Sequence, residues 1–84
     1  MGKAGKALKQ VLETYGITQN RLAVTMGLNR STVYQWFNEI TDPSAESVTQ
    51  IIAALEQLNA AAAKDFVRLY LGRLTQPEPE PPED

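Results

Sequence analysis

The sequence predicts an all-α fold, a compact bundle of five helices followed by an acidic, proline-rich tail. Apolar residues recur three and four positions apart in successive segments, which is the spacing of a buried face on a helix. Residues that cap or end helices separate these segments, and no segment shows the period of two that a half-buried strand requires. A chain of 84 residues has room for one domain, which we place at residues 1–74, with the tail at residues 75–84.

The first helix is predicted over residues 3–15, and Gly16 stands where it must end. Its apolar stripe comprises Ala4, Leu8, Val11, Leu12 and Tyr15. The second helix is predicted over residues 19–26, because the hydroxyl of Thr18 is suited to cap a helix that begins there.

Residues 19–38 have the pattern of a helix-turn-helix. Ala23 is small enough to let a second helix approach, and Gly27 adopts the left-handed conformation of a helix end without strain. Asn29 is then expected to cap a third helix, over residues 30–38, with its side-chain oxygen. The apolar seam of the motif is predicted to consist of Leu22, Met26, Leu28, Val33, Trp36 and Phe37. The side chains left to face outward are Arg30, Ser31, Thr32, Tyr34, Gln35 and Asn38.

The fourth helix is opened by Pro43 and Ser44, and Asn59 caps a fifth helix over residues 60–72. The fourth helix has one apolar stripe, formed by Val48, Ile51, Ile52, Leu55 and Leu58. The fifth helix has two: Phe66, Leu69 and Tyr70 form one, and Val67, Leu71 and Leu74 form its neighbour. A helix that packs only within its own domain needs a single face, so the second stripe suggests contact with the same helix of another subunit. The alternative is that both stripes cover a small core.

The last ten residues, TQPEPEPPED, contain four prolines and four acidic residues. Such a segment lacks apolar side chains to bury, and its prolines oppose a helix, so we expect a disordered tail.

Charge is divided unevenly along the chain, although the net charge is −2. Residues 1–38 carry five basic residues and one acidic residue, a net charge of +4. Residues 39–84 carry three basic and nine acidic residues, a net charge of −6. The positive half contains the helix-turn-helix pattern, so its local field suits a polyanion. A solvated helix beside an acidic tail is the alternative interpretation.

Several classes of function are excluded by composition. The chain has neither cysteine nor histidine, which excludes a disulfide scaffold, a zinc finger, a Cys/His nucleophile and an imidazole base. There is no glycine-rich phosphate loop, so we expect no enzyme, no cofactor, no metal ion and no small-molecule ligand. No apolar stretch is long enough to span a membrane, and the N-terminus lacks the apolar region of a signal peptide, so a cytoplasmic location is expected.

Residues 5–58 resemble the Xre/Cro and phage-repressor family of helix-turn-helix DNA-binding domains, and residues 19–38 carry the most specific part of the resemblance. The matching features are Thr18-Gln19, Leu22-Ala23, Gly27, the run Asn29, Arg30, Ser31, Thr32 and Val33, then Trp36 and Pro43. Many members have a glycine and basic residues in the loop after the third helix, where this chain has Glu39, Ile40, Thr41 and Asp42. That departure puts a phosphate contact from this loop in question.

The resemblance implies a homodimer that places two third helices in successive major grooves of a pseudo-palindromic DNA site. The expected DNA contacts are Gln19, Asn29, Arg30, Ser31, Thr32, Tyr34, Gln35 and Asn38. The expected dimer contacts are Val67, Leu71 and Leu74.

Individual side chains have competing interpretations. Arg30 stands in the first turn of the third helix, which favours a bidentate contact with guanine over a surface ion pair with Glu13. Gln19 is expected to bind a phosphate at the N-terminus of the second helix. The alternative is that its side chain is only solvated at that helix end. The hydroxyl of Tyr34 is a candidate for a second phosphate contact. Trp36 stands beside an apolar position, so core packing is favoured over stacking on bases, as it is for its neighbour Phe37.

The predicted function is a sequence-specific transcriptional regulator, most simply a repressor that occludes a promoter, with double-stranded DNA and a second copy of the chain as partners. A labile antitoxin that represses its own operon is a variant of this function. An adaptor that keeps the fold and binds protein instead of DNA is the alternative, because fold alone does not determine function. The acidic loop and tail favour the adaptor, and the outward polar set favours DNA.

Overall fold

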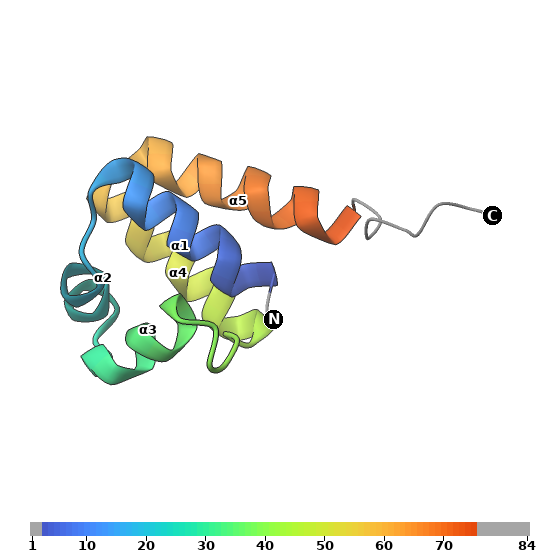
Figure 1. Ribbon diagram of the computed structural model, residues 1–84. Helices are drawn as coiled ribbons and strands as arrows, with labels where there is room; N and C mark the ends of the chain where they lie inside the picture. The colour runs from blue at the N-terminus through green and yellow to red at the C-terminus, as the bar shows by residue number, and fades with distance from the viewer. Residues whose placement is uncertain (1–2, 76–84) are drawn as a thin grey trace.

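The computed structural model describes residues 3–75, which form five helices joined by short connections (Figure 1). The helices are α1 (Lys3–Tyr15), α2 (Gln19–Met26), α3 (Arg30–Phe37), α4 (Ala45–Leu58) and α5 (Ala60–Thr75). The described residues contain no strand. The all-α prediction with five helices is therefore confirmed.

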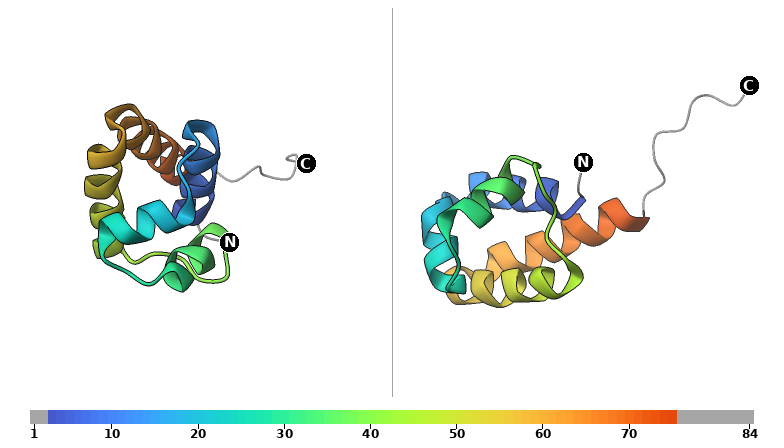
Figure 2. Two further views of the ribbon diagram at one scale, coloured as in Figure 1. Left: turned by 90° about the vertical axis from the view of Figure 1, so that its left-hand side faces the viewer. Right: turned by 90° about the horizontal axis from the view of Figure 1, so that it is seen from below.

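The helices enclose one apolar core. α5 packs against both α1 and α4, and α2 packs against α3 and α4 (Figure 1, Figure 2). α3 also contacts α1, so the helix-turn-helix is held from two sides. The largest fully buried side chains are Phe66, Leu8, Leu12, Leu22, Ile51, Leu55, Val11 and Val33. α1 contributes three of these eight, as expected from its apolar stripe.

The helix ends follow the predicted capping residues. The Thr18 hydroxyl accepts a hydrogen bond from the Arg21 amide at 3.0 Å, and the Ser44 hydroxyl accepts one from the Ser47 amide at 3.1 Å. The side-chain oxygen of Asn59 accepts one from the Ala61 amide at 2.9 Å at the start of α5. These contacts satisfy amides that the first turn of each helix leaves without an intrahelical partner.

Two glycines end helices in the left-handed conformation, Gly16 after α1 with φ 67° and Gly27 after α2 with φ 71°. The predicted ends differ elsewhere. α3 ends at Phe37, and α5 continues through Gly72 to Thr75. Gly72 lacks the positive φ that ends a helix, so it is an interior residue, and Thr75 belongs to α5 and not to the predicted tail.

The start of α1 is fastened to the segment after α3. The Gly5 amide donates a hydrogen bond to the Asp42 carboxylate at 3.1 Å, across 37 residues of sequence. A Cβ atom at Gly5 would lie only 2.8 Å from the carbonyl oxygen of Trp36, so the position admits no side chain unless α1 or α3 shifts. Gly5 therefore allows α1 and α3 to approach closely.

A second long-range contact joins α1 to α5. The Tyr15 hydroxyl donates a hydrogen bond to the Asp65 carboxylate at 2.5 Å, and Arg68 lies 3.3 Å from the other oxygen of that carboxylate. The hydrogen bond from Tyr15 is the main reason that the pKa of Asp65 lies below its ordinary value. The same bond, with burial adding to it, raises the pKa of Tyr15 above its ordinary value.

The two stripes of α5 have different environments. Phe66 is fully buried, and its ring stacks on that of Tyr70 with the centroids 6.0 Å apart. Val67 is half-buried, and Leu71 is 50% exposed. The first stripe thus faces the core, whereas the described members of the second, Val67 and Leu71, lie partly at the surface. The Leu74 side chain and the predicted tail from residue 76 onward lie outside the described residues.

None of the five helices in residues 3–75 combines the length and the apolar character that crossing a membrane requires.

Candidate nucleic-acid interface

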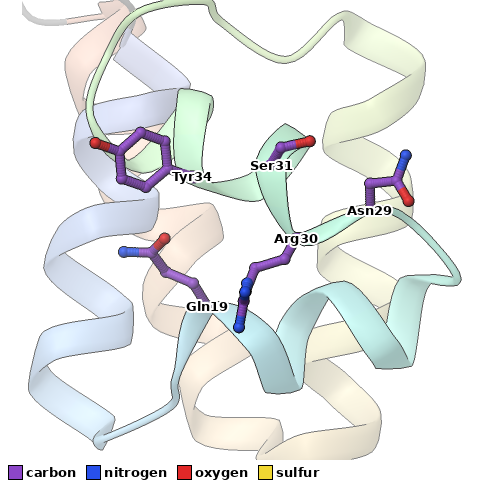
Figure 3. Close-up of a pocket in the computed structure, with 5 residues that line it drawn as sticks. All are labelled: Gln19, Asn29, Arg30, Ser31 and Tyr34. Carbon is purple, nitrogen blue, oxygen red and sulfur yellow. The ribbon is translucent and has the colours of Figure 1, made fainter.

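An open polar hollow lies where the N-terminal ends of α2 and α3 meet. It is lined by Gln19, Asn29, Arg30, Ser31 and Tyr34, and its volume is about 630 Å³. In the view of Figure 3 the Gln19 side chain lies between the Tyr34 ring and the Arg30 side chain, and Ser31 and Asn29 lie beyond Arg30. Enclosed small-molecule pockets are mainly apolar. This hollow is open and lined by four polar residues and one tyrosine, which suits the edge of a large polar partner.

The turn between the two helices brings these side chains together. The left-handed Gly27 redirects the chain after α2, and the Leu28 amide donates a hydrogen bond to the Ala23 carbonyl at 2.9 Å. Ala23 is 1% exposed, so α3 approaches α2 at a position where a larger side chain would hold it away. α3 then begins at Arg30, which places its first turn beside the first residue of α2.

Leu28 differs from its prediction as a buried member of the seam, since it is 36% exposed. It follows Gly27 in the turn itself, where the chain runs past the end of α2, and its backbone amide bonds to the Ala23 carbonyl. Met26 and Phe37 are half-buried, and Leu22, Val33 and Trp36 are buried. The remaining members of the predicted seam therefore pack as expected.

Asn29 occupies the N-cap position of α3, but its side chain makes no capping hydrogen bond. The predicted side-chain cap is therefore wrong. The Thr32 amide instead donates to the backbone carbonyl of Asn29 at 3.1 Å, and Asn29 is one of the residues that line the hollow. The Asn29 side chain is exposed and is not used in capping α3, which leaves it available to an outside partner.

Arg30 is exposed at the first position of α3. Among the described residues it has no salt-bridge partner, so the ion pair with Glu13 considered as an alternative is not formed. A guanidinium at this place can present its planar donors to a base edge or to a phosphate.

Thr32, Gln35 and Asn38 do not line the hollow. Gln35 is exposed, one position beyond Tyr34 on the outward side of α3. Thr32 is half-buried, and the Asn38 side-chain amide donates a hydrogen bond to the Tyr34 carbonyl at 2.9 Å. Asn38 therefore also satisfies a carbonyl group near the C-terminal end of α3, which its predicted outward position did not indicate.

The aromatic residues of α3 have separate environments. Trp36 is 5% exposed within the apolar core, which confirms core packing and excludes stacking on bases. Phe37 is half-buried, and the Lys9 ammonium lies 5.7 Å from the centroid of its ring. This cation–π contact joins α1 to α3 and depends on a helix pairing that residue spacing alone does not disclose.

The segment after α3 is acidic and conformationally unusual. Glu39 has φ 60°, in the left-handed region that glycine usually occupies. Asp42 is held by the Gly5 amide. The two carboxylates lie between α3 and α4 with no basic residue among residues 39–42, so this segment repels phosphate instead of attracting it.

Residues 8–58 match the model of the helix-turn-helix family. Neither a curated protein nor a solved structure matches the chain. The matched segment covers more than half of the sequence and contains α2, the turn at Gly27 and α3. The chain therefore belongs to the helix-turn-helix family of the Xre/Cro and phage-repressor type, a family of DNA-binding regulators.

Proposed function

We propose that this protein is a sequence-specific DNA-binding transcriptional regulator whose α3 enters the major groove. The observation that carries the proposal is the exposed hollow at the N-terminal end of α3, where one arginine, two amide side chains, a serine and a tyrosine converge. Recognition helices contact base edges mainly through their N-terminal residues. Guanidinium, amide and hydroxyl groups are the side-chain types that pair with base edges and phosphates.

The proposed contacts divide into those that read bases and those that hold the backbone. Arg30 reads a guanine, and Asn29, Ser31, Thr32, Gln35 and Asn38 complete the surface that reads the groove. Gln19, at the first position of α2, binds a phosphate together with the backbone amides of that helix end. The Tyr34 hydroxyl, on a ring that is 52% exposed, binds a second phosphate.

The protein acts as a homodimer on two half-sites one helical turn apart, about 34–36 Å between centres. The stripe formed by Val67, Leu71 and Leu74 on α5 supplies the dimer contact. Support comes from the exposure of Leu71 and from the direction of α5, whose C-terminal end projects beyond the other helices (Figure 2). The simplest regulation by a domain bound in the major groove is repression through occlusion of a promoter, and with DNA as its partner the protein is expected in the cytoplasm. An antitoxin that represses its own operon would act in the same way.

Selection of bound fragments from random double-stranded DNA tests the central claim. The expected result is enrichment of a pseudo-palindromic sequence with half-sites one helical turn apart. No enrichment at low salt would contradict sequence-specific binding.

The roles of individual residues are tested on the selected sequence and on random DNA. Arg30→Ala and Gln35→Ala are each expected to weaken binding by about 1–3 kcal/mol at one position of the site and to relax the preference there. Gln19→Ala is expected to weaken binding to both DNAs alike, because a phosphate contact carries no base information. Equal losses on both DNAs for all three variants would contradict these roles.

Sedimentation of the Leu71→Glu variant tests the dimer. A charge placed in the symmetric interface should yield a folded monomer. Val24→Glu is the matched control, because Val24 is an aliphatic residue of α2 that is 70% exposed. A dimeric Leu71→Glu variant, or dissociation by both variants, would contradict the assignment of this stripe.

The acidic segment at Glu39 and Asp42 favours a second candidate function, a protein-binding adaptor that retains the fold without DNA. The same selection separates the two functions, since an adaptor would enrich no DNA sequence.

A further inference from the structure

A helix-turn-helix that reads bases also needs contacts that hold it on the phosphate backbone, and these contacts provide much of the affinity. The segment after α3 is poorly suited to provide them. Its ionisable groups are the carboxylates of Glu39 and Asp42, and Asp42 is already bonded to Gly5. Positive charge beside α3 must therefore come from another element.

Of α1 and α2, the helices packed against α3, α2 carries one basic residue, Arg21, and α1 carries three, Lys3, Lys6 and Lys9. Lys6 and Lys9 are one turn apart in α1, and both are exposed. Neither forms a salt bridge among the described residues, not even with Glu13 of the same helix. In Figure 3 the ribbon of α1 passes on the side of the hollow where the Tyr34 ring lies.

α1 is held firmly relative to α3. The close approach at Gly5 and its hydrogen bond to Asp42 fix the N-terminal end of α1 against the C-terminal end of α3. Lys9 is then positioned by the Phe37 ring, 5.7 Å from its ammonium, so one cation of α1 rests on the proposed recognition helix itself. A lysine restrained in this way loses less freedom on binding than one on an unrestrained surface.

We infer that the outer face of α1, through Lys6 and Lys9, binds the DNA phosphates beside the bases that α3 reads. The inference rests on the proposed function. It names α1 as the source of the backbone contacts that basic residues after the third helix supply in many members of the family. It assigns the backbone contact to a helix that precedes the helix-turn-helix, and it assigns the Phe37 ring to position Lys9.

The experiment measures the dissociation constant of the full chain for its selected duplex and for a random duplex over a range of salt concentrations. The variants are Lys6→Gln, Lys9→Gln and the double variant. Each phosphate contact contributes about 0.9 to the slope of log affinity against log salt, so the double variant should lower that slope by about 1.8. Affinity should fall by a similar factor on both duplexes, because phosphates carry no base identity.

The matched control is Lys64→Gln, which makes the same charge change on α5, an element on the opposite side of the domain from α3 (Figure 1). It should leave the slope unchanged. An unchanged slope in the double variant, or an equal decrease with Lys64→Gln, would overturn the inference. Absence of DNA binding by the unmodified chain would instead overturn the proposed function, so the two failures are distinguishable.

A double-mutant cycle tests the positioning role of Phe37. Lys9→Gln should reduce affinity less in a Phe37→Leu background than in the unmodified chain, because the ammonium is then no longer held beside α3. Equal losses in the two backgrounds would contradict the role given to the ring.

Discussion

Replacing Glu39 by glycine should stabilise the domain, although it removes a side chain. Glu39 has φ 60°, and a residue with a Cβ atom pays about 1–2 kcal/mol for the left-handed conformation. Glycine escapes this strain but makes the unfolded chain more flexible, which costs about 0.4–1 kcal/mol. Mid-range values of the two effects leave a net gain of about 0.8 kcal/mol, which in a domain of this size should raise Tm by about 3–6 °C.

The assay is thermal unfolding followed by circular dichroism, with Glu39→Ala as the control. Alanine removes the carboxylate and its charge but keeps the Cβ atom, so the backbone strain remains. Glu39→Gly should therefore unfold at a higher temperature than both Glu39→Ala and the unmodified chain. If the alanine variant gains as much as the glycine variant, charge and not backbone conformation limits stability at this position, and the reasoning is refuted.

Three further predictions concern the contacts of α1 and the packing of Trp36 in the core. Gly5→Ala should destabilise the domain by about 1–3 kcal/mol in denaturant unfolding, because its Cβ would meet the Trp36 carbonyl at 2.8 Å. The control Gly72→Ala, where a Cβ meets nothing within 4 Å, should stabilise it by about 0.5–1 kcal/mol. Trp36→Ala should cost about 3–5 kcal/mol of stability by circular dichroism, and a folded variant that loses only DNA binding would contradict core packing. Tyr15→Phe should lower Tm most near neutral pH. The stabilisation from Asp65, whose pKa is lowered, is lost as pH falls through that pKa, and the stabilisation from Tyr15, whose pKa is raised, is lost as pH rises through it. A Tm difference that stays constant from acid to alkaline pH would contradict this contact.

The helices and most of their ends could be predicted from sequence because the interactions that define them are local. Each of the caps Thr18, Ser44 and Asn59 accepts a bond from an amide two or three residues ahead. Gly16 and Gly27 each directly follow the last residue of a helix. Such contacts depend on neighbouring residues alone, so the order of residue types contains them.

The contacts that fix α1 could not be predicted, because they join residues far apart in the chain. The bond from Gly5 to Asp42 spans 37 residues, and the bond from Tyr15 to Asp65 spans 50. The same limit applies to the candidate site. The outward polar set was predicted from helical spacing, but which of its members converge on one hollow depends on how α2 and α3 cross, and this separates Ser31 from Thr32.

The charge of the chain affects how strongly this protein would bind random DNA relative to its own site. A chain of net charge −2 with an acidic segment after α3 attracts random DNA weakly, because non-specific binding comes almost entirely from phosphate contacts. Base contacts at Arg30 then contribute a larger share of the total than they would in a basic domain. The ratio of specific to non-specific affinity determines how often a regulator occupies its site in a genome. On the proposed function, lysines on α1 supply the affinity for the DNA backbone, while the acidic segment weakens binding to any DNA, so that base contacts decide which site is occupied. Asp42→Asn, which is neutral and can still accept the bond from Gly5, should accordingly strengthen binding to random DNA and to the selected site by a similar factor, because repulsion of phosphates carries no base information. Unchanged affinity for both DNAs, or a gain on only one of them, would contradict this role of the acidic segment.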